Sequence, residues 1–282
     1  MLKAFAMPRI GMGTAQLRGP VLTALVQEAI AIGYRHIDTA IHYDNAQDIG
    51  AGIRQSGIDR EHLFVTTKMS PRSLTADKVR ASMEQALRDL GTDYVDLLLI
   101  HWPNPAVPLE ETLGAFSELK RQQWIRHIGV SNFTTPLLDE AQRACSDPIV
   151  VNQVEYHPYL SQSTLVSNCR ARGVAITAFS PLAAGRVHSD PVITAIAKEK
   201  NRSNAQVVLR WLLQQPGISA IPRSSNPQRL RENIDVQGFE LTPQEMDLLF
   251  GLARTDGRLV NSTWSPSWDG DSAASSGDRL QA

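Results

Sequence analysis

The sequence predicts a mixed α/β fold, a (β/α)8 barrel with an extra C-terminal helix. Eight short apolar runs alternate with stretches of helical periodicity, and no linker-like segment interrupts the 282 residues. Most of the runs are nearly continuous rather than alternating, which is typical of parallel strands covered on both faces. Such a barrel needs roughly 250 residues, so length alone favours neither one domain nor two. From the uninterrupted alternation we expect one domain over residues 1–270 and a mobile polar tail at 271–282.

The expected elements follow one another along the chain. The strand segments are 9–14, 36–40, 63–68, 94–100, 127–132, 150–156, 174–180 and 219–224. Helical patterns lie between them, for example at 21–33, 76–91, 109–123 and 204–217, and a further helix at 243–254 would pack outside the barrel. Ser203 with Gln206, and Thr242 with Glu245, have capping-box spacing, while Gly33, Gly91, Gly173 and Gly217 stand where helices should end.

Composition argues against several classes of protein. The net charge is −1 and no basic block is present, so a nucleic-acid partner is not expected. No apolar run approaches the roughly 18 residues of a membrane span, and the N-terminus lacks the apolar region of a signal peptide. Two cysteines are too few for a disulfide framework or a Cys-rich zinc site. We therefore expect a cytoplasmic protein that binds neither membrane nor metal.

Polar residues gather where the predicted strands end, which is where barrel enzymes carry their chemistry. Asp38 ends the second strand, Lys68 the third, and His101 follows the fourth, while Tyr43 lies in the loop after Asp38. Each residue alone has an ordinary explanation as a turn, solvated or structural side chain. Because four titratable groups on three adjacent strands would converge at one end, we interpret them together as a catalytic site.

This combination of side chains suits proton delivery to a carbonyl oxygen. A tyrosine with an unperturbed pKa of about 10 is a poor acid near neutrality, and an adjacent ammonium would lower that pKa. Lys68 supplies the ammonium, and Asp38 would hold it in place and keep it protonated. His101 would orient the substrate oxygen beside Tyr43. No nucleophile is paired with a base, so acyl transfer fits poorly.

The chain resembles the aldo-keto reductases over roughly residues 5 to 255. The resemblance rests on GYRHIDTAIHYDN (33–45), LFVTTK (63–68), TDYVDLLLIHWP (92–103), IRHIGVSNF (125–133), VVNQVEYHPYL (150–160), AFSPLAAG (178–185) and IPRSSNPQRLREN (221–233). It implies a (β/α)8 barrel that reduces aldehydes and ketones by hydride transfer from NADPH, without metal. The trimmed loops look most like bacterial 2,5-diketo-D-gluconate reductases of the shorter B type.

The resemblance also implies which residues form the site. The catalytic set would be Asp38, Tyr43, Lys68 and His101, with Tyr43 as general acid. The nicotinamide half of the cofactor would contact Gly13, Thr14, Ser131, Asn132, Gln153 and Phe179, with Ser180 and Leu182 nearby. Arg223, Ser224 and Arg229 would hold the adenosine 2′-phosphate, and Glu232 and Asn233 would contact adenine. Trp102, Trp264 and Trp268 would line the substrate pocket.

Some features depart from the family or have a second explanation. Ala46 stands where many relatives carry Glu. This departure leaves open which side chain supports the loop around Tyr43. Ser225 and Pro227 would also serve as the cap and first turn of a helix. Keto-sugars, methylglyoxal, aromatic aldehydes and 2-keto esters remain candidate substrates, and a monomer is the expectation from the family.

Other classes of protein fit less well. GMGTAQ (11–16) begins like a dinucleotide fingerprint but lacks its third glycine. A Schiff-base aldolase would use Lys68 as a nucleophile, but the neighbouring Asp38 favours the charged amine. Metal hydrolases need clustered histidines, and the seven histidines show neither H-x-H nor HExxH spacing. An inactive NADPH-binding regulatory subunit is the non-enzymatic alternative.

Overall fold

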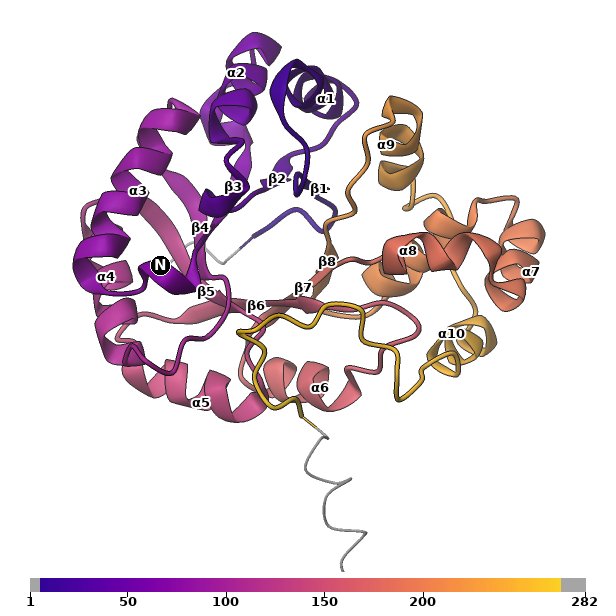
Figure 1. Cartoon of the computed structure of the whole chain (residues 1–282). Helices are drawn as coiled ribbons and strands as arrows, with labels where there is room; N and C mark the ends of the chain where they lie inside the picture. Colours follow the sequence, from indigo (N-terminus) through magenta and orange to yellow (C-terminus); the bar gives the residue numbers. More distant parts are fainter. Residues whose placement is uncertain (1–5, 270–282) are drawn as a thin grey trace, which may run out of the picture.

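The computed structural model describes residues 6–269, and they form a barrel of eight parallel strands surrounded by helices (Figure 1). The strands are β1 Met12–Gly13, β2 His36–Asp38, β3 Phe64–Met69, β4 Val95–Ile100, β5 Ile125–Ser131, β6 Ile149–Glu155, β7 Ala175–Phe179 and β8 Ile218–Ala220. They pair in sequence order, and parallel bridges from Ile10 to Ala220 and from Gly13 to Arg223 close the barrel. The predicted fold class is therefore confirmed, whereas the expected tail at 271–282 lies outside the described residues.

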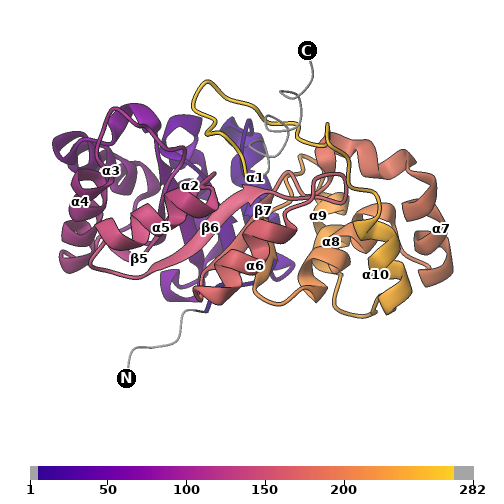
Figure 2. The ribbon, with the colours of Figure 1, turned by 90° about the horizontal axis from the view of Figure 1, so that it is seen from below.

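The helices surround the sheet on its outer face (Figures 1 and 2). They are α1 Gly19–Ala31, α2 Ala46–Ser56, α3 Ala76–Leu90, α4 Leu109–Arg121, α5 Thr135–Ala144, α6 Ser163–Ala171, α7 Pro191–Lys200, α8 Asn204–Gln214, α9 Pro227–Ile234 and α10 Pro243–Phe250. The expected extra helix is α10. The connection from β7 to β8 carries both α7 and α8, and the sequence analysis did not predict α7. Within residues 6–269 no helix is long and apolar enough to cross a bilayer.

The core explains why the strands appear as continuous apolar runs. Successive side chains of a strand point to opposite faces, and every residue of β3 and of β4 is buried. Leu98 and Ile100 belong to the large cluster with the surrounding helices, whereas Leu97 and Leu99 form a small separate cluster with Phe64 and Val151. Both faces of the sheet therefore exclude water, as a barrel with a filled interior requires.

Helix ends follow the predicted signals with one exception. Both capping boxes are formed, at Ser203 and at Thr242. The glycines expected at helix ends, Gly33, Gly91, Gly173 and Gly217, all have positive φ. Pro227 opens α9 as expected, but the cap is Asn226 rather than Ser225, because the Asn226 side chain accepts the backbone N–H of Gln228 at 2.8 Å.

Candidate active site

Asp38 and Lys68 form a buried ion pair at the ends of β2 and β3. Lys68 Nζ pairs with Asp38 Oδ1 and also donates to the carbonyl oxygen of Thr39 at 2.8 Å. The second oxygen, Asp38 Oδ2, accepts from Gln153 Nε2 at 2.7 Å. Both side chains are almost completely buried. Because each oxygen of the carboxylate has a partner, the ammonium is held in one position.

Tyr43 and His101 face one another beside this pair. Tyr43 ends the short 3-10 helix η1 Ile41–Tyr43, and its ring centroid lies 5.3 Å from Lys68 Nζ. The ring of His101, which follows β4, lies 5.9 Å from that of Tyr43 at an interplanar angle of 75°. The structure thus brings together the four residues that the sequence selected, with the phenol between an ammonium and an imidazole.

The loop around Tyr43 is supported by Asn45, which is buried. Its Nδ2 donates to the carbonyl oxygens of Thr14 and Leu17 at 3.0 and 3.1 Å, and its Oδ1 accepts from the Thr39 hydroxyl at 2.8 Å. These bonds tie the loop to the end of β1 and to β2. The side chain that fixes the loop therefore precedes Ala46, the position at which the sequence departs from many relatives.

The charges of the site follow from burial and neighbours. Burial raises the pKa of Tyr43, the ammonium of Lys68 opposes this rise, and Asp38 adds to it. The expectation that Lys68 would bring this pKa below its ordinary value was wrong, because burial has the larger effect. Burial by itself lowers the pKa of Lys68, yet Asp38 and Tyr43 raise it above its usual value. Burial, then Lys68 and His42, lowers the pKa of His101 well below its usual value, so the imidazole is neutral.

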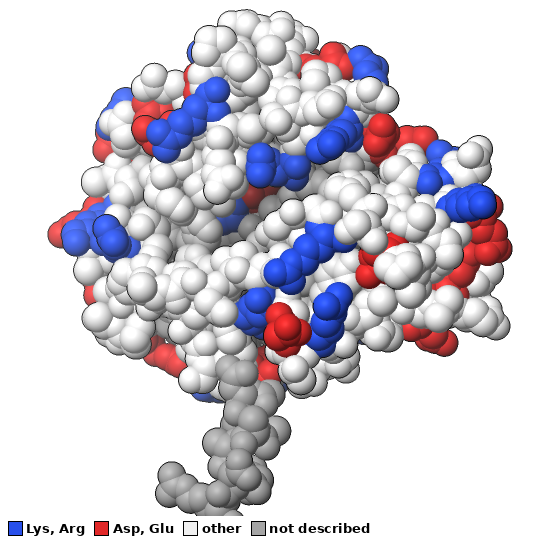
Figure 3. Space-filling view, turned by 45° about the vertical axis from the view of Figure 1, so that its right-hand side comes forward, with Lys and Arg blue, Asp and Glu red and all other residues white. Residues whose placement is uncertain are grey.

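A cavity of about 880 Å³ opens at this end of the barrel (Figure 3). Sixteen of the residues predicted from the sequence line it: Gly13, Thr14, Asp38, Tyr43, His101, Trp102, Asn132, Gln153, Phe179, Ser180, Leu182, Arg223, Ser224, Arg229, Glu232 and Asn233. Lys and Arg side chains surround the hollow in Figure 3. The predicted residues therefore line one continuous cavity, which extends from Asp38, Tyr43 and His101 to Arg223 and Arg229.

Four predicted residues do not line the cavity. Lys68 is buried against Asp38, as described above. Ser131 is buried, and its hydroxyl donates to the carbonyl oxygen of Gln153 at 2.8 Å. Trp268 packs edge-to-face on Trp102, with ring centroids 6.2 Å apart, and Trp264 is likewise absent from the lining. Of the three predicted pocket tryptophans, Trp102 alone contacts the cavity, and Trp268 supports it from behind.

Residues 257–269, which we term the C-terminal strap, cross the cavity end of the barrel (Figure 2). Glu155 at the end of β6 anchors them: its carboxylate accepts the backbone N–H groups of Leu259 at 2.7 Å and Val260 at 3.0 Å. At the other end, Asp269 accepts from the backbone N–H and the hydroxyl of Thr135 at the start of α5. The strap places Val260 in the cavity wall.

Sequence reasoning missed several lining residues. Pro181, Ala184, Gly185 and His188 come from the segment after β7, where the motif AFSPLAAG was the available signal. Val260 was missed because nothing local in the strap marks its contact with β6. Glu155 does not line the cavity, and its role as the anchor of the strap was missed for the same reason.

The residues at both ends of the cavity fit NADPH. Asn132 has a left-handed backbone at φ 63°, and its Nδ2 donates to the His101 carbonyl oxygen at 2.9 Å. Its Oδ1 is buried without a hydrogen-bond partner in the described part of the chain, as suits an acceptor for a carboxamide N–H. At the far end, neither guanidinium of Arg223 and Arg229 has an ion pair or hydrogen bond within residues 6–269, which leaves both for phosphate.

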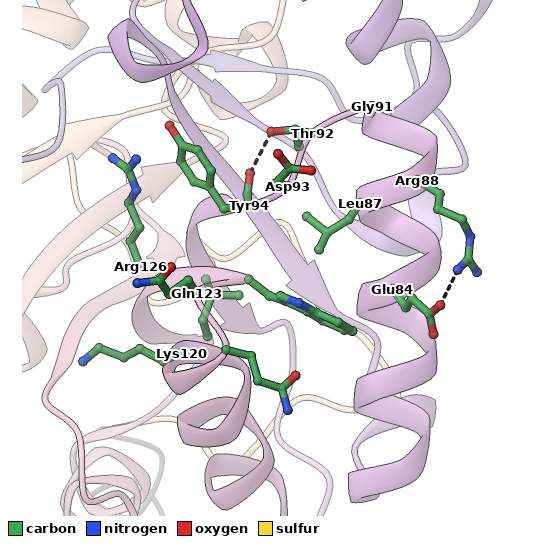
Figure 4. A pocket seen from close by; sticks show the side chains of 13 residues that line it. Glu84, Leu87, Arg88, Gly91, Thr92, Asp93, Tyr94, Lys120, Gln123 and Arg126 are labelled. Carbon is green, nitrogen blue, oxygen red and sulfur yellow. Dashed lines mark hydrogen bonds and ion pairs between the residues drawn. The ribbon is translucent and has the colours of Figure 1, made fainter.

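A larger hollow of about 1090 Å³ lies elsewhere, between α3, α4 and the N-terminal ends of β4 and β5 (Figure 4). Tyr94 in its wall makes cation–π contacts with two arginines. The guanidinium carbons of Arg60 and Arg126 lie 4.2 and 3.9 Å from the centroid of the Tyr94 ring. Arg60 also pairs with Asp96 at 2.8 Å. Because barrel chemistry resides at the opposite ends of the strands, we assign the smaller cavity, not this one, as the candidate active site.

Comparison with known proteins identifies the class to which this barrel and site belong. The chain matches the model of the Aldo/keto reductase family over residues 9–253. It is 39% identical over 265 residues to methylglyoxal reductase DkgB of Salmonella typhi, covering 93% of this chain and 99% of that protein. The chain therefore belongs to the aldo/keto reductase family.

Solved structures agree in fold. One named for 2,5-diketo-D-gluconic acid reductase B superposes with a TM-score of 0.92 at 40% identity, covering 93% of this chain and 94% of that chain. A variant of Gox0644 in complex with NADPH superposes with a TM-score of 0.85 at 38% identity, covering 90% and 93% of the two chains.

Proposed function

We propose that this protein reduces small aldehydes and ketones with NADPH and that Tyr43 is the general acid. The observation that supports this most directly is the arrangement of Tyr43 between the Lys68 ammonium and the neutral His101 at the cavity wall. Family membership and the NADPH complex of the Gox0644 variant support the choice of cofactor.

The chain's own residues would perform the proton transfer. When bound, NADPH supplies a hydride to the carbonyl carbon. His101, neutral because burial lowers its pKa, donates a hydrogen bond to the carbonyl oxygen and orients it toward Tyr43. Tyr43 is protonated at neutral pH, since the ordinary pKa of a tyrosine is about 10 and burial raises it further. It would deliver this proton as negative charge develops on that oxygen. Lys68, held by Asp38, stabilises the phenolate that remains.

Residues at both ends of the cavity would hold the cofactor. The unpartnered Oδ1 of Asn132 accepts from the carboxamide, and Phe179 offers a ring face to the nicotinamide. Arg223 and Arg229 bind the 2′-phosphate that distinguishes NADPH from NADH. Ser224 Oγ accepts the Asn226 backbone N–H at 3.0 Å, so it shapes the turn that presents these guanidinium groups.

The substrates proposed for this chain are small polar carbonyl compounds such as methylglyoxal or diketo-sugar acids. The names of the relatives support this range, and so does the cavity wall, in which Trp102 adds a large apolar surface to the polar Tyr43 and His101. We further propose that the protein acts as a cytoplasmic monomer. Sedimentation of the purified chain at micromolar concentration tests the oligomeric state.

A Schiff-base role for Lys68 is the second candidate from the sequence. A nucleophilic lysine must be uncharged, whereas Asp38 and Tyr43 raise the pKa of Lys68 above its usual value. Borohydride trapping of a carbonyl substrate on Lys68 would support the aldolase. Binding of NADPH without turnover on any carbonyl would instead support a regulatory subunit.

The test is NADPH oxidation across a panel of carbonyl compounds, with NADH alongside. For Tyr43→Phe we expect kcat to fall by at least about 100-fold, which is the usual contribution of a general acid, while the Kd of NADPH is unchanged. Tyr94→Phe, at the opposite end of the barrel, is the matched control and should keep its kcat. A Tyr43→Phe protein that retains kcat would exclude Tyr43 as the acid.

A further inference from the structure

His42 immediately precedes Tyr43 and packs against the rings of Tyr43 and His101, but it has no part in the mechanism proposed above. Its ring centroid is 4.8 Å from that of Tyr43, edge-on at 68°, and 4.7 Å from that of His101, at 43°. The three rings thus form a triangle in which His42 contacts both groups that would hold the carbonyl oxygen. Unlike His101, His42 is exposed at the surface.

The hydrogen-bonding capacity of His42 is unused. Neither ring nitrogen has a hydrogen-bond partner among residues 6–269, although the ring packs against two polar side chains. The ring of His42 is only partly removed from solvent by its neighbours, and this partial burial, followed by the Lys68 charge, lowers the pKa of His42 from its ordinary value. The imidazole is therefore neutral at pH 7. A neutral imidazole has one N–H donor and one nitrogen acceptor, and it can therefore pair with a hydroxyl or a carbonyl oxygen.

We propose that His42 determines substrate specificity by hydrogen-bonding an oxygen on the carbon next to the carbonyl that is reduced. The proposal rests on the proposed function, because it takes the reacting oxygen to lie between Tyr43 and His101. A substituent one bond away from that carbonyl then passes within reach of the third ring of the triangle. Tyr43 and His101 are already committed to the reacting oxygen, so His42 is the neighbouring group left to bind the second one.

The substrate class that follows is 2-oxo and 2-hydroxy aldehydes and ketones, in preference to plain alkyl aldehydes. The cavity lining includes Trp102, which packs against Trp268 and presents an apolar surface. His42 is exposed and lies beside the lining residues Tyr43 and His101 rather than in the lining itself. In the proposed complex the carbon skeleton of the substrate would contact Trp102, and its vicinal oxygen would reach His42 at the edge of the cavity.

The experiment compares methylglyoxal with 2-methylpropanal, an aldehyde of similar size in which a methyl group replaces the second oxygen. Steady-state kcat/KM for both is measured with NADPH for the unmodified protein, His42→Leu and His42→Gln. For His42→Leu we expect kcat/KM on methylglyoxal to fall by about five- to tenfold, the effect of one neutral hydrogen bond, with less than about twofold change on 2-methylpropanal. His42→Gln keeps a donor and an acceptor and should recover most of the loss.

Each alternative outcome has a definite meaning. Equal losses on both aldehydes would overturn the proposal, since His42 would then act by packing on Tyr43 and His101. An unchanged kcat/KM on methylglyoxal would overturn it as well. The Kd of NADPH and the thermal midpoint of each variant exclude a folding defect. If the unmodified protein oxidises NADPH with neither aldehyde nor any other carbonyl, the proposed function fails, which is distinct from either result.

Discussion

Replacing Glu155 by Gln should release the C-terminal strap from the barrel. The Glu155 carboxylate is completely buried and accepts three hydrogen bonds, from the backbone N–H groups of Leu259 and Val260 and from His157 Nε2 at 2.9 Å. A glutamine amide has one oxygen, so its NH2 group must face one of the two backbone N–H donors. The substitution keeps the volume of the side chain and removes one acceptor.

The size of the effect follows from these contacts. A hydrogen bond to a charged group contributes about 1.5 to 3 kcal/mol, and the donor left behind is buried. Loss of about 2 kcal/mol of strap anchoring raises the population of the open strap by about 30-fold. Because the strap supplies Val260 to the wall and Trp268 to the back of Trp102, we expect a higher KM for the carbonyl substrate.

Amide hydrogen exchange at Leu259 and Val260 measures strap opening directly, and kinetics with NADPH measure its consequence. We expect exchange to accelerate by about 30-fold and KM for the carbonyl to rise. The Kd of NADPH should stay constant, since Arg223 precedes α9 and Arg229 lies within it, outside the strap. Glu245→Gln is the matched control. Its carboxylate is also buried, and it accepts from the Thr242 backbone N–H and pairs with Lys200, far from the strap.

Three results would refute this reasoning. Unchanged exchange at positions 259 and 260 in Glu155→Gln would mean that other contacts, such as that of Asp269 with Thr135, anchor the strap without Glu155. Faster exchange with an unchanged KM would mean that the strap is not part of the substrate wall. Equal acceleration in Glu245→Gln would attribute the effect to global stability.

Two further predictions concern the cofactor and acid stability. Arg229→Ala should raise the Kd of NADPH by at least about tenfold, because a phosphate contact from Arg contributes more than a neutral hydrogen bond. The Kd of NADH should stay nearly unchanged. Equal losses of affinity in titrations with the two cofactors would mean that Arg229 does not bind the 2′-phosphate. Burial lowers the pKa of His36 to about 4 from 6.5, so the folded state keeps it neutral while the unfolded state takes up a proton as the pH falls below 6.5. His36 should therefore remove about 2 kcal/mol of unfolding free energy between pH 7 and pH 5, and urea titrations of His36→Gln should show a correspondingly smaller loss.

The barrel could be predicted from the sequence because short-range patterns indicate its strands and helices. Continuous apolar runs such as β4 and capping boxes such as that at Ser203 depend on neighbours within a few residues. Helix α7 was missed because it adds a second helix to one β–α connection, and its short sequence PVITAIAKEK lies directly before the stronger pattern of α8. The cap of α9 was misplaced by one residue because Ser225 and Asn226 are both good capping residues.

The site was predictable in its members and less so in its connections. Asp38, Lys68 and His101 each end a strand, so the barrel rule alone brings them together. The bond from Gln153 to Asp38 joins residues 115 positions apart, and the bonds of Glu155 reach the strap about 104 positions later. No local pattern encodes such pairs, because they depend on how β6 and the strap are placed by the completed barrel.

The charge balance at Tyr43 could not be obtained from the sequence either, and it changes how the acid works. Lys68 was expected to lower the pKa of the phenol, but burial has the larger effect and raises it. Burial has two opposite effects on the phenolate. The low-dielectric surroundings disfavour an isolated phenolate, but they also strengthen its attraction to a fixed ammonium. Because Asp38 and Thr39 keep that ammonium in place, phenolate is favoured when the proton has an acceptor beside it. In the proposed mechanism, Tyr43 would therefore keep its proton at rest and donate it once a carbonyl oxygen becomes negative.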